Sequence, residues 1–309
     1  MLDPRELYTL AEEQPAAGEL DRPVLVHALG GFIDAGQAGR LAGEHLVSSL
    51  ENRVLATFDV DQLYDFRARR PAMTFVEDHW ESYQTPELVL RGVRDSAGTG
   101  FLMLTGPEPD TQWERFVTAV DQLVDRYGVR LTIGMHAIPM AVPHTRPAGM
   151  TAHATRKDLI SAQPSWVGNV QVPGNIAGLL ELRLGQAGKD AAGFAVHVPH
   201  YLTQAEFPDA AVALVEAVGE LGQLQLPTTS LAEAGAQTRA AIEEQVSAQP
   251  EVAAVVSALE QQYDAYIAGR ANALPLAGET GELPTADELG AELERFLAEE
   301  NDRRGRGDS

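Results

Sequence analysis

The sequence predicts an α/β domain with a largely parallel β-sheet and helices on both of its faces, followed by a helical C-terminal extension. In the first part of the chain, short apolar runs of strand length alternate with amphipathic stretches of helix length, as in a parallel sheet covered by helices. Near residues 224–230, alanine-rich sequence with helical periodicity replaces the β-branched runs. We therefore predict an α/β domain over residues 1–228, an acidic helical extension over residues 229–300 and a disordered tail over residues 301–309.

Buried strands are predicted where a short apolar run ends at a turn residue or a polar loop. These runs are residues 24–29, 54–58, 88–93, 101–104, 129–135 and 193–198. Helices are predicted between them, at residues 36–50, 111–127, 175–184 and 209–221. In the second of these helices the apolar side chains from Trp113 to Tyr127 form one stripe, and Gly128 ends it. A further apolar segment at residues 73–76 predicts a hairpin or an excursion from the sheet.

Helical signals fill the extension. Ser230 and Glu233 form a capping box, and so do Thr285 and Glu288. Pro250 is placed for a helix start, and apolar residues follow it at helical spacing. They are Val252, Val255, Val256, Leu259, Tyr263 and Ile267. Because such a stripe must be buried, we expect these helices to pack on the sheet domain, on each other or on another subunit.

Composition and charge exclude several classes of protein. The 309 residues include no cysteine, 23 Lys and Arg and 45 Asp and Glu, which gives a formal net charge of −22. Without thiols there are no disulfides and no thiolate metal sites, and we expect a cytoplasmic protein. Such an acidic chain repels phosphate backbones and anionic lipids, so we expect no binding to nucleic acid or to a membrane. Residues 204–309 carry −14 of this charge, so the acidity is concentrated in the C-terminal third of the chain.

The first candidate site is the segment LGGFIDAGQAG, which follows the strand predicted to end at residue 29. Open parallel sheets bind ligands beyond the carboxyl ends of their strands. Gly30 and Gly31 allow a ligand to approach the backbone, and the helix start that follows favours an anion. The spacing matches neither a dinucleotide fingerprint nor a phosphate loop. A structural strand–turn–helix connection with Asp34 as the helix cap therefore stands beside ligand binding.

The second candidate is the segment HAIPMAVPHTRP, after the strand predicted to end at residue 135. His144, Thr145 and Arg146 lie between two prolines, which hold the loop extended. Arg146 can bind a carboxylate or a phosphate through two hydrogen bonds, and His144 can transfer protons. In the structural alternative, Arg146 pairs with an acidic residue of the chain and the loop packs at an interface.

The third candidate is the segment HVPHYL. We interpret His197 as a core histidine with a hydrogen-bond partner, because it lies in a predicted buried strand. His200 and Tyr201 follow Pro199 in the turn beyond that strand, which is a better place for ligand contact. Asn175, after a Pro-Gly turn and before a helix, is either part of an anion site or a helix cap.

No complete set of catalytic or metal-binding residues is recognisable. The sequence contains neither a G-x-S-x-G nucleophile motif nor an H-E-x-x-H zinc motif. The histidine spacings support no metal cluster, so we predict no metal and no cofactor. Whether the chain is an enzyme stays open, and the missing catalytic set argues against it.

Together, the candidate segments resemble the PAC2 family, the family of proteasome assembly chaperone 2 and its prokaryotic relatives. The resemblance rests on LGGFIDAG, AVPHTRP, VPGN and HVPHYL in this order, over about residues 20–225. It implies a three-layer α/β/α fold with a mixed, largely parallel sheet, similar to the phosphorylase/hydrolase fold, and a homo-oligomer. The acidic helical extension is similar to that of bacterial members. Eukaryotic members are non-enzymatic chaperones of proteasome α-subunits, so the resemblance also implies a proteasome-related protein partner.

Three hypotheses for the function follow. The leading one is a non-enzymatic, homo-oligomeric protein of this family that binds proteins or acts like an assembly chaperone. The alternative is an enzyme or small-anion-binding protein, in which Arg146 holds the anion, His144 or His200 moves protons, and residues 30–36 donate backbone hydrogen bonds. A third makes the helical extension a device for subunit assembly. The decisive observation is whether the three candidate loops line one cleft.

Overall fold

The structure, a computed structural model, describes residues 2–16, 18–31, 33–161 and 169–272. Its strands are β1 (Tyr8–Leu10), β2 (Val24–Gly30), β3 (Asn52–Phe58), β4 (Met73–Val76), β5 (His79–Tyr83), β6 (Val89–Arg94), β7 (Gly100–Pro107), β8 (Leu131–Met140), β9 (Met150–Ala154) and β10 (Ala191–Pro199). Its α-helices are α1 (Ala38–Ser49), α2 (Val60–Leu63), α3 (Trp113–Arg126), α4 (Ile176–Gln186), α5 (Pro208–Gly222), α6 (Thr229–Ala248) and α7 (Pro250–Asn272). Short 3₁₀ helices occur at Pro4–Leu7, Ala35–Gln37, Lys157–Ile160 and His200–Leu202.

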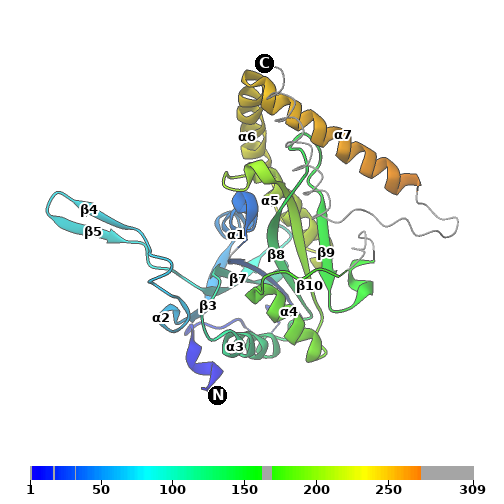
Figure 1. Cartoon of the computed structure of the whole chain (residues 1–309). Coiled ribbons are helices and arrows are strands. Elements are labelled where there is room, and N and C mark those ends of the chain that lie inside the picture. The colour runs from blue at the N-terminus through cyan, green and yellow to red at the C-terminus, as the bar shows by residue number, and fades with distance from the viewer. Residues whose placement is uncertain (1, 17, 32, 162–168, 273–309) are drawn as a thin grey trace, which may run out of the picture. The chain divides into compact units, whose positions relative to one another are not determined.

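A mixed, mostly parallel sheet of eight strands forms the centre of the domain, in the order β1-β3-β6-β7-β2-β8-β10-β9 (Figure 1). β2 pairs in parallel with β7 and β8, and β8 pairs in parallel with β10. β1, β6 and β9 run antiparallel to their neighbours. Because β2, β8 and β10 point the same way, the loops that follow them emerge at one edge of the sheet.

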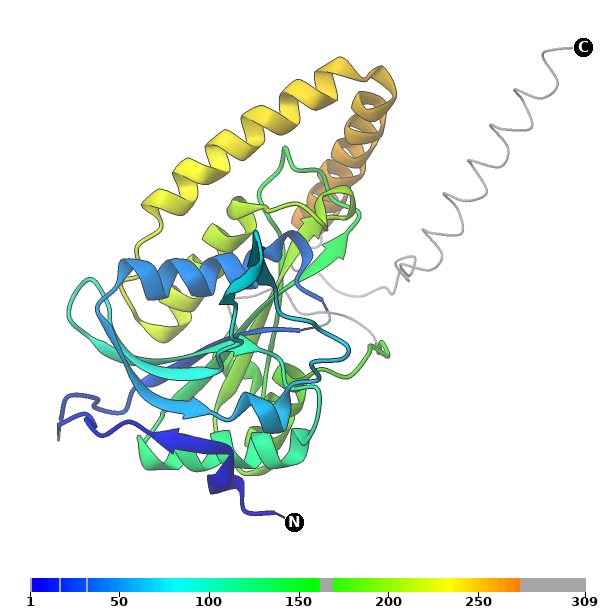
Figure 2. The same cartoon turned by 90° about the vertical axis from the view of Figure 1, so that its left-hand side faces the viewer.

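One apolar core lies on each face of the sheet. α1 and α5 pack on one face, where Leu46 and Leu214 are fully buried. α3 and α4 pack on the other face, where Phe116 and Leu180 are fully buried. Figures 1 and 2 show α1 and α3 on opposite sides of the sheet. The predicted three-layer α/β/α fold is therefore confirmed.

The structure corrects several predicted boundaries. β8 continues to Met140 because it stays in register with β10 to the end of that strand, so residues 136–140 belong to the sheet and not to the second candidate loop. α1 begins at Ala38 rather than at residue 36, since Gly36 and Gln37 have φ values of 63° and 53° and cannot continue a right-handed helix. The short strands β1 and β9 were not predicted.

The apolar segment at residues 73–76 forms a hairpin, as expected. β4 pairs with β5, and the two strands make a sheet of their own that shares no strand with the main sheet. Figure 1 shows the hairpin as an arm that projects from the domain. Both of its strands are almost wholly exposed.

Polar and apolar contacts attach the first helix of the extension. His45 Nε2 of α1 lies 2.7 Å from the carbonyl oxygen of Pro227, just before α6, and Leu231 of α6 is buried. Val256 and Leu259 from the predicted stripe of α7 are also buried, whereas Val255 is 52% exposed. Residues 1–263 form one compact unit and residues 264–309 a second, so α7 crosses the division. The domain boundary after residue 228 stays a prediction, and the predicted helix and tail after residue 285 lie outside the described residues.

Candidate functional site

The first candidate loop uses Asp34 to start α1. One carboxylate oxygen of Asp34 accepts a hydrogen bond from the backbone N–H of Gly39 at 2.8 Å, and the other accepts one from Arg40 at 2.9 Å. These N–H groups have no partner inside the helix, so the carboxylate satisfies them. Burial raises the pKa of Asp34, although the two N–H donors oppose this. Both oxygens of Asp34 are thus engaged in the fold, as the structural alternative predicted.

The same loop is joined to the loop after β10. The Gly36 N–H donates to the Thr203 carbonyl at 3.0 Å, and the Phe207 N–H donates to the Gly36 carbonyl at 2.9 Å. Arg40 adds an ion pair to Glu206 at 2.5 Å. The first and third candidate segments therefore lie side by side at the carboxyl edge of the sheet, held by bonds to the backbone of Gly36.

His144 of the second loop reaches Tyr201 of the third. The His144 side chain is 5% exposed, and its Nδ1 lies 2.7 Å from the Tyr201 hydroxyl. The His144 backbone N–H donates to the same hydroxyl at 2.9 Å, so that oxygen accepts one bond and can donate its proton to Nδ1. Burial lowers the pKa of His144, opposed by nearby carboxylates on α5, α6 and α7, and burial raises the pKa of Tyr201. Burial thus favours the neutral form of both side chains in this contact. His200 beside it is exposed.

The other residues of the second loop bind α7. The Thr145 hydroxyl donates to Glu260 at 2.5 Å, and Arg146 Nη1 lies 3.2 Å from the same carboxylate oxygen. The Tyr263 hydroxyl donates to the Pro147 carbonyl at 3.3 Å. The partner of Arg146 is therefore an acidic residue of the chain, which is the structural alternative stated above.

Asn175 and Gly31 belong to a separate group of contacts. The Asn175 side chain accepts a hydrogen bond from Gly178 N–H at 2.7 Å and so caps α4. Glu108 follows β7, and its carboxylate accepts a hydrogen bond from the Ile176 N–H at 2.5 Å. The backbone N–H of Glu108 donates to the Gly30 carbonyl at 2.8 Å. A Cβ on Gly31 would lie 2.5 Å from the Glu108 carboxylate, so a larger residue there would require the Glu108 side chain to move. Glu108 links these segments, and nothing in the local sequence indicated it.

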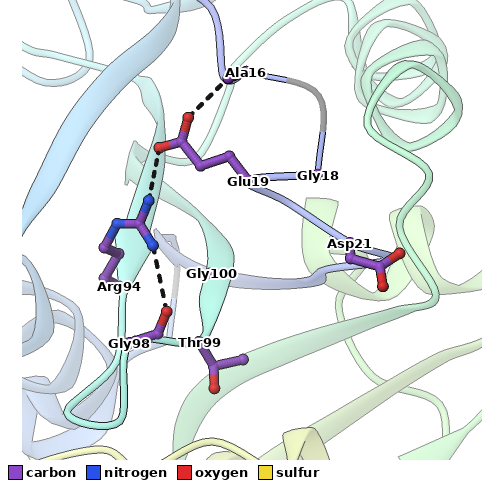
Figure 3. Close-up of a pocket in the computed structure, with 8 residues that line it drawn as sticks. All are labelled: Ala16, Gly18, Glu19, Asp21, Arg94, Gly98, Thr99 and Gly100. Atoms are coloured by element: carbon purple, nitrogen blue, oxygen red, sulfur yellow. Dashed lines mark hydrogen bonds and ion pairs between the residues drawn. The ribbon is translucent and has the colours of Figure 1, made fainter.

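Apart from Asp34, which binds the first turn of α1, the candidate residues form two groups. His144, Thr145, Arg146, His200 and Tyr201 belong to one group with α7, while Gly30, Gly31 and Asn175 belong to the other around Glu108. Two depressions in the described part of the chain are lined by other residues. The larger, with a volume of about 640 Å³, lies where β6 ends and β7 begins, at the opposite end of the parallel strands (Figure 3).

Glu19, Asp21 and Arg94 are the charged residues that line the larger depression, and Glu19 and Arg94 bind each other. Arg94 binds the Glu19 carboxylate at 3.1 Å and the Gly98 carbonyl at 3.4 Å (Figure 3). Arg53, outside the depression, binds Glu19 at 2.6 Å. Hydrogen bonding from Arg53 lowers the pKa of Glu19. Within the residues that the structure describes, there is no group of three metal-ligating side chains placed for an ion. No helix among them is long and apolar enough to cross a membrane.

Comparisons with known proteins identify a family and several similar structures. The sequence model of the PAC2 family matches residues 28–246. A Mycobacterium tuberculosis protein of unknown function is 52% identical, covers 86% of this chain and 92% of its own, and superposes with a TM-score of 0.83. A protein of unknown function from Corynebacterium glutamicum is 37% identical, with coverage of 85% and 98% and a TM-score of 0.81.

A more distant relative carries a functional description. A proteasome-assembly chaperone homologue from Mycobacterium tuberculosis is 25% identical, with coverage of 75% of this chain and 99% of its own and a TM-score of 0.69. No functionally curated protein matches the sequence. The four sequence segments predicted the same family, and the family model now spans most of the α/β domain and part of α6. The chain belongs to the PAC2 family.

Proposed function

We propose that the chain is a non-enzymatic, homo-oligomeric protein that binds other proteins in the manner of an assembly chaperone. The observation that carries this proposal is the β4–β5 arm. Its exposed fractions are 51% for Met73, 54% for Phe75, 63% for Trp80 and 45% for Tyr83. Large apolar side chains gathered on an exposed element are typical of a protein–protein contact surface.

Strand pairing gathers these side chains on one face of the arm. Met73 is opposite Tyr83, and Phe75 is opposite Trp80 with their rings 5.0 Å apart. Thr74 lies between them in β4 and points to the other face, where its hydroxyl accepts a hydrogen bond from Ser82. An isolated two-stranded hairpin is marginally stable in water, so the arm needs a partner that covers its apolar face.

A second copy of the chain fits the charges of the arm. The turn of the hairpin carries Glu77 and Asp78, while Arg67 and Arg70 precede β4 at its base, and all four side chains are exposed. Two arms that pack with the tip of one beside the base of the other bring opposite charges together. Such a contact covers both apolar faces at once, which supports a homo-oligomer.

The polar loops give less support to the anion-binding or enzymatic alternative. Asp34 and Asn175 are used as helix caps, Arg146 is paired with Glu260, and His144 is paired with Tyr201. An anion at Arg146 would compete with a carboxylate 3.2 Å away. We also propose a cytoplasmic location, since the sequence contains no cysteine.

The proposed partner is the proteasome core, because a chaperone homologue of that particle is 25% identical to this chain. To test this, the full chain is incubated with separately purified α and β subunits of the proteasome core from the same organism. We expect a complex on native gels and a changed rate of core-particle formation. The variant Phe75→Ser/Trp80→Ser should lose this effect if the oligomer is the active form.

The matched control is Val170→Ser/Val172→Ser, which removes two valines that are 66% and 67% exposed but lie outside the arm. This control should behave like the unaltered chain. No complex with either subunit, together with an unchanged assembly rate, would contradict the chaperone function.

A further inference from the structure

A row of two histidines and two glycines crosses the sheet on the face that α4 covers. The register places His27 of β2 beside Gly134 of β8, Gly134 beside Gly193 of β10, and Gly193 beside His153 of β9. A Cβ at Gly134 would lie 2.7 Å from Cε1 of His27, and a Cβ at Gly193 would overlap the His153 ring. Both imidazoles therefore lie over glycines, and a side chain at either glycine would displace them.

A third histidine joins this row. His136 is two residues beyond Gly134, so it projects from the same face of β8, and its ring centre lies 5.5 Å from that of His153. His27 is 3% exposed. The Nδ1 atoms of His27 and His136 are buried and have no hydrogen-bond partner among the described residues. Because an unpaired buried nitrogen costs stability, packing alone does not account for histidine at these positions.

The charged groups that face the row come from few elements. α4 contributes Glu181, whose Oε2 lies 2.8 Å from His153 Nδ1. β10 contributes His197, which is held by the Thr151 hydroxyl of β9 at 2.8 Å. α3 packs on this face through apolar side chains. Among the described residues, the charges that act on His27 and His136 are those of the other imidazoles, so a proton added there meets repulsion.

We propose that the row of His27, His136 and His153 is an acid-sensitive latch, which keeps β9 and α4 on the sheet at neutral pH and releases them when His27 and His136 are protonated. β9 is the last strand of the sheet, and β9 and α4 follow one another along the chain between β8 and β10. They can therefore separate without breaking the parallel pairing of β2, β8 and β10. Release would uncover the histidine row and the α4 face of the sheet.

The direction of the pH effect follows from the charge state. Burial lowers the pKa of His27 and of His136 to about 4, from an ordinary value near 6.5. The closed state then binds fewer protons than the open one, so closure is favoured above pH 6.5 and weakens as the pH falls towards 4. At about pH 5 each histidine favours the open state by roughly 30-fold relative to pH 7.5, and two histidines together by several hundred-fold.

Hydrogen exchange measured by mass spectrometry tests the latch in the full-length protein. The protein is compared at pH 7.5 and pH 5 after correction for the intrinsic exchange rate. For peptides from residues 150–161 and 176–186, we expect the equilibrium constant for opening to increase by several hundred-fold at the lower pH. Peptides from β2 and β7 should stay protected. In His27→Leu/His136→Gln the increase should disappear, and in His136→Gln alone it should fall to about 30-fold.

The control is His79→Gln, in the exposed hairpin, which should behave like the unaltered chain. Equal protection of residues 150–161 and 176–186 at both pH values would overturn the proposal. A loss of protection in every strand at once would also overturn it. So would a pH effect in His136→Gln that is as large as in the unaltered chain. The single variant keeps the test decisive if the double variant does not fold.

Discussion

Replacing Arg115 by alanine should lower the free energy of unfolding by about 3 kcal/mol. The Arg115 side chain, at the start of α3, is 5% exposed and donates hydrogen bonds in three directions. Its Nε and Nη2 bind the Asp3 carbonyl at 3.0 and 2.6 Å, and its Nη1 binds the side-chain oxygens of Gln62 and Gln112 at 3.0 and 2.8 Å. Alanine removes this donor from all three acceptors, and with it one of the links between the N-terminal segment, α2 and α3.

The matched control for this change is Arg183→Ala. Arg183 binds Glu114 of α3 from the neighbouring helix, but its side chain is 39% exposed, and an exposed ion pair contributes about 0–1 kcal/mol. Arg115→Lys should be intermediate, because an ammonium group cannot serve acceptors on three sides. Urea unfolding followed by circular dichroism measures all three variants. Equal stabilities of Arg115→Ala and Arg183→Ala would show that the buried guanidinium is not a structural centre.

Replacing Gly106 by alanine should lower the free energy of unfolding by at least about 3 kcal/mol, because backbone strain and overlap of the new Cβ add. Gly106, near the end of β7, has a φ of 143°, a conformation that side chains disfavour. A Cβ there would lie 2.6 Å from the Leu88 Cα and closer still to the Glu87 carbonyl oxygen. Both neighbours are backbone atoms of the segment that returns from the hairpin arm, so neither can rotate away.

Gly98→Ala separates the two contributions. Gly98 also has a positive φ, of 87°, but its Cβ would meet no atom within 4 Å. Gly98→Ala should therefore lower the free energy of unfolding by about 1 kcal/mol, from backbone strain alone. Thermal unfolding of the two variants gives the difference, and an insoluble Gly106→Ala beside a soluble Gly98→Ala has the same meaning. Equal melting temperatures would show that the segment at residues 87–88 can move away from β7.

Local patterns in the sequence were sufficient for most of the fold. The buried strands and the helices around them came from apolar runs and from helical stripes such as that of α3, which depend on neighbours in the chain. β9 was missed because its five residues include Thr151 and His153 and lack an apolar run. The end of β8 was misplaced because only its pairing with β10 shows that the strand continues through Pro139.

The candidate site depends on contacts that no local pattern contains. His144 and Tyr201 were each predicted to lie in a loop beyond a strand, but their hydrogen bond joins two loops that are far apart in the sequence. Glu260, the partner of Arg146, is in α7 and was not singled out, because one glutamate in an acidic extension has no distinguishing signal. The histidine row needs the register of four strands, so His27, His136 and His153 could not be associated from their positions in the chain.

Sedimentation velocity of the full-length protein tests the central claim, which is that the chain works as a homo-oligomer assembled through the β4–β5 arm. The unaltered chain and Val170→Ser/Val172→Ser should sediment as the same oligomer. Phe75→Ser/Trp80→Ser should sediment as a monomer while its circular dichroism and melting temperature stay close to those of the unaltered chain. A monomeric unaltered chain, or an arm variant that keeps the full oligomer, would contradict the account.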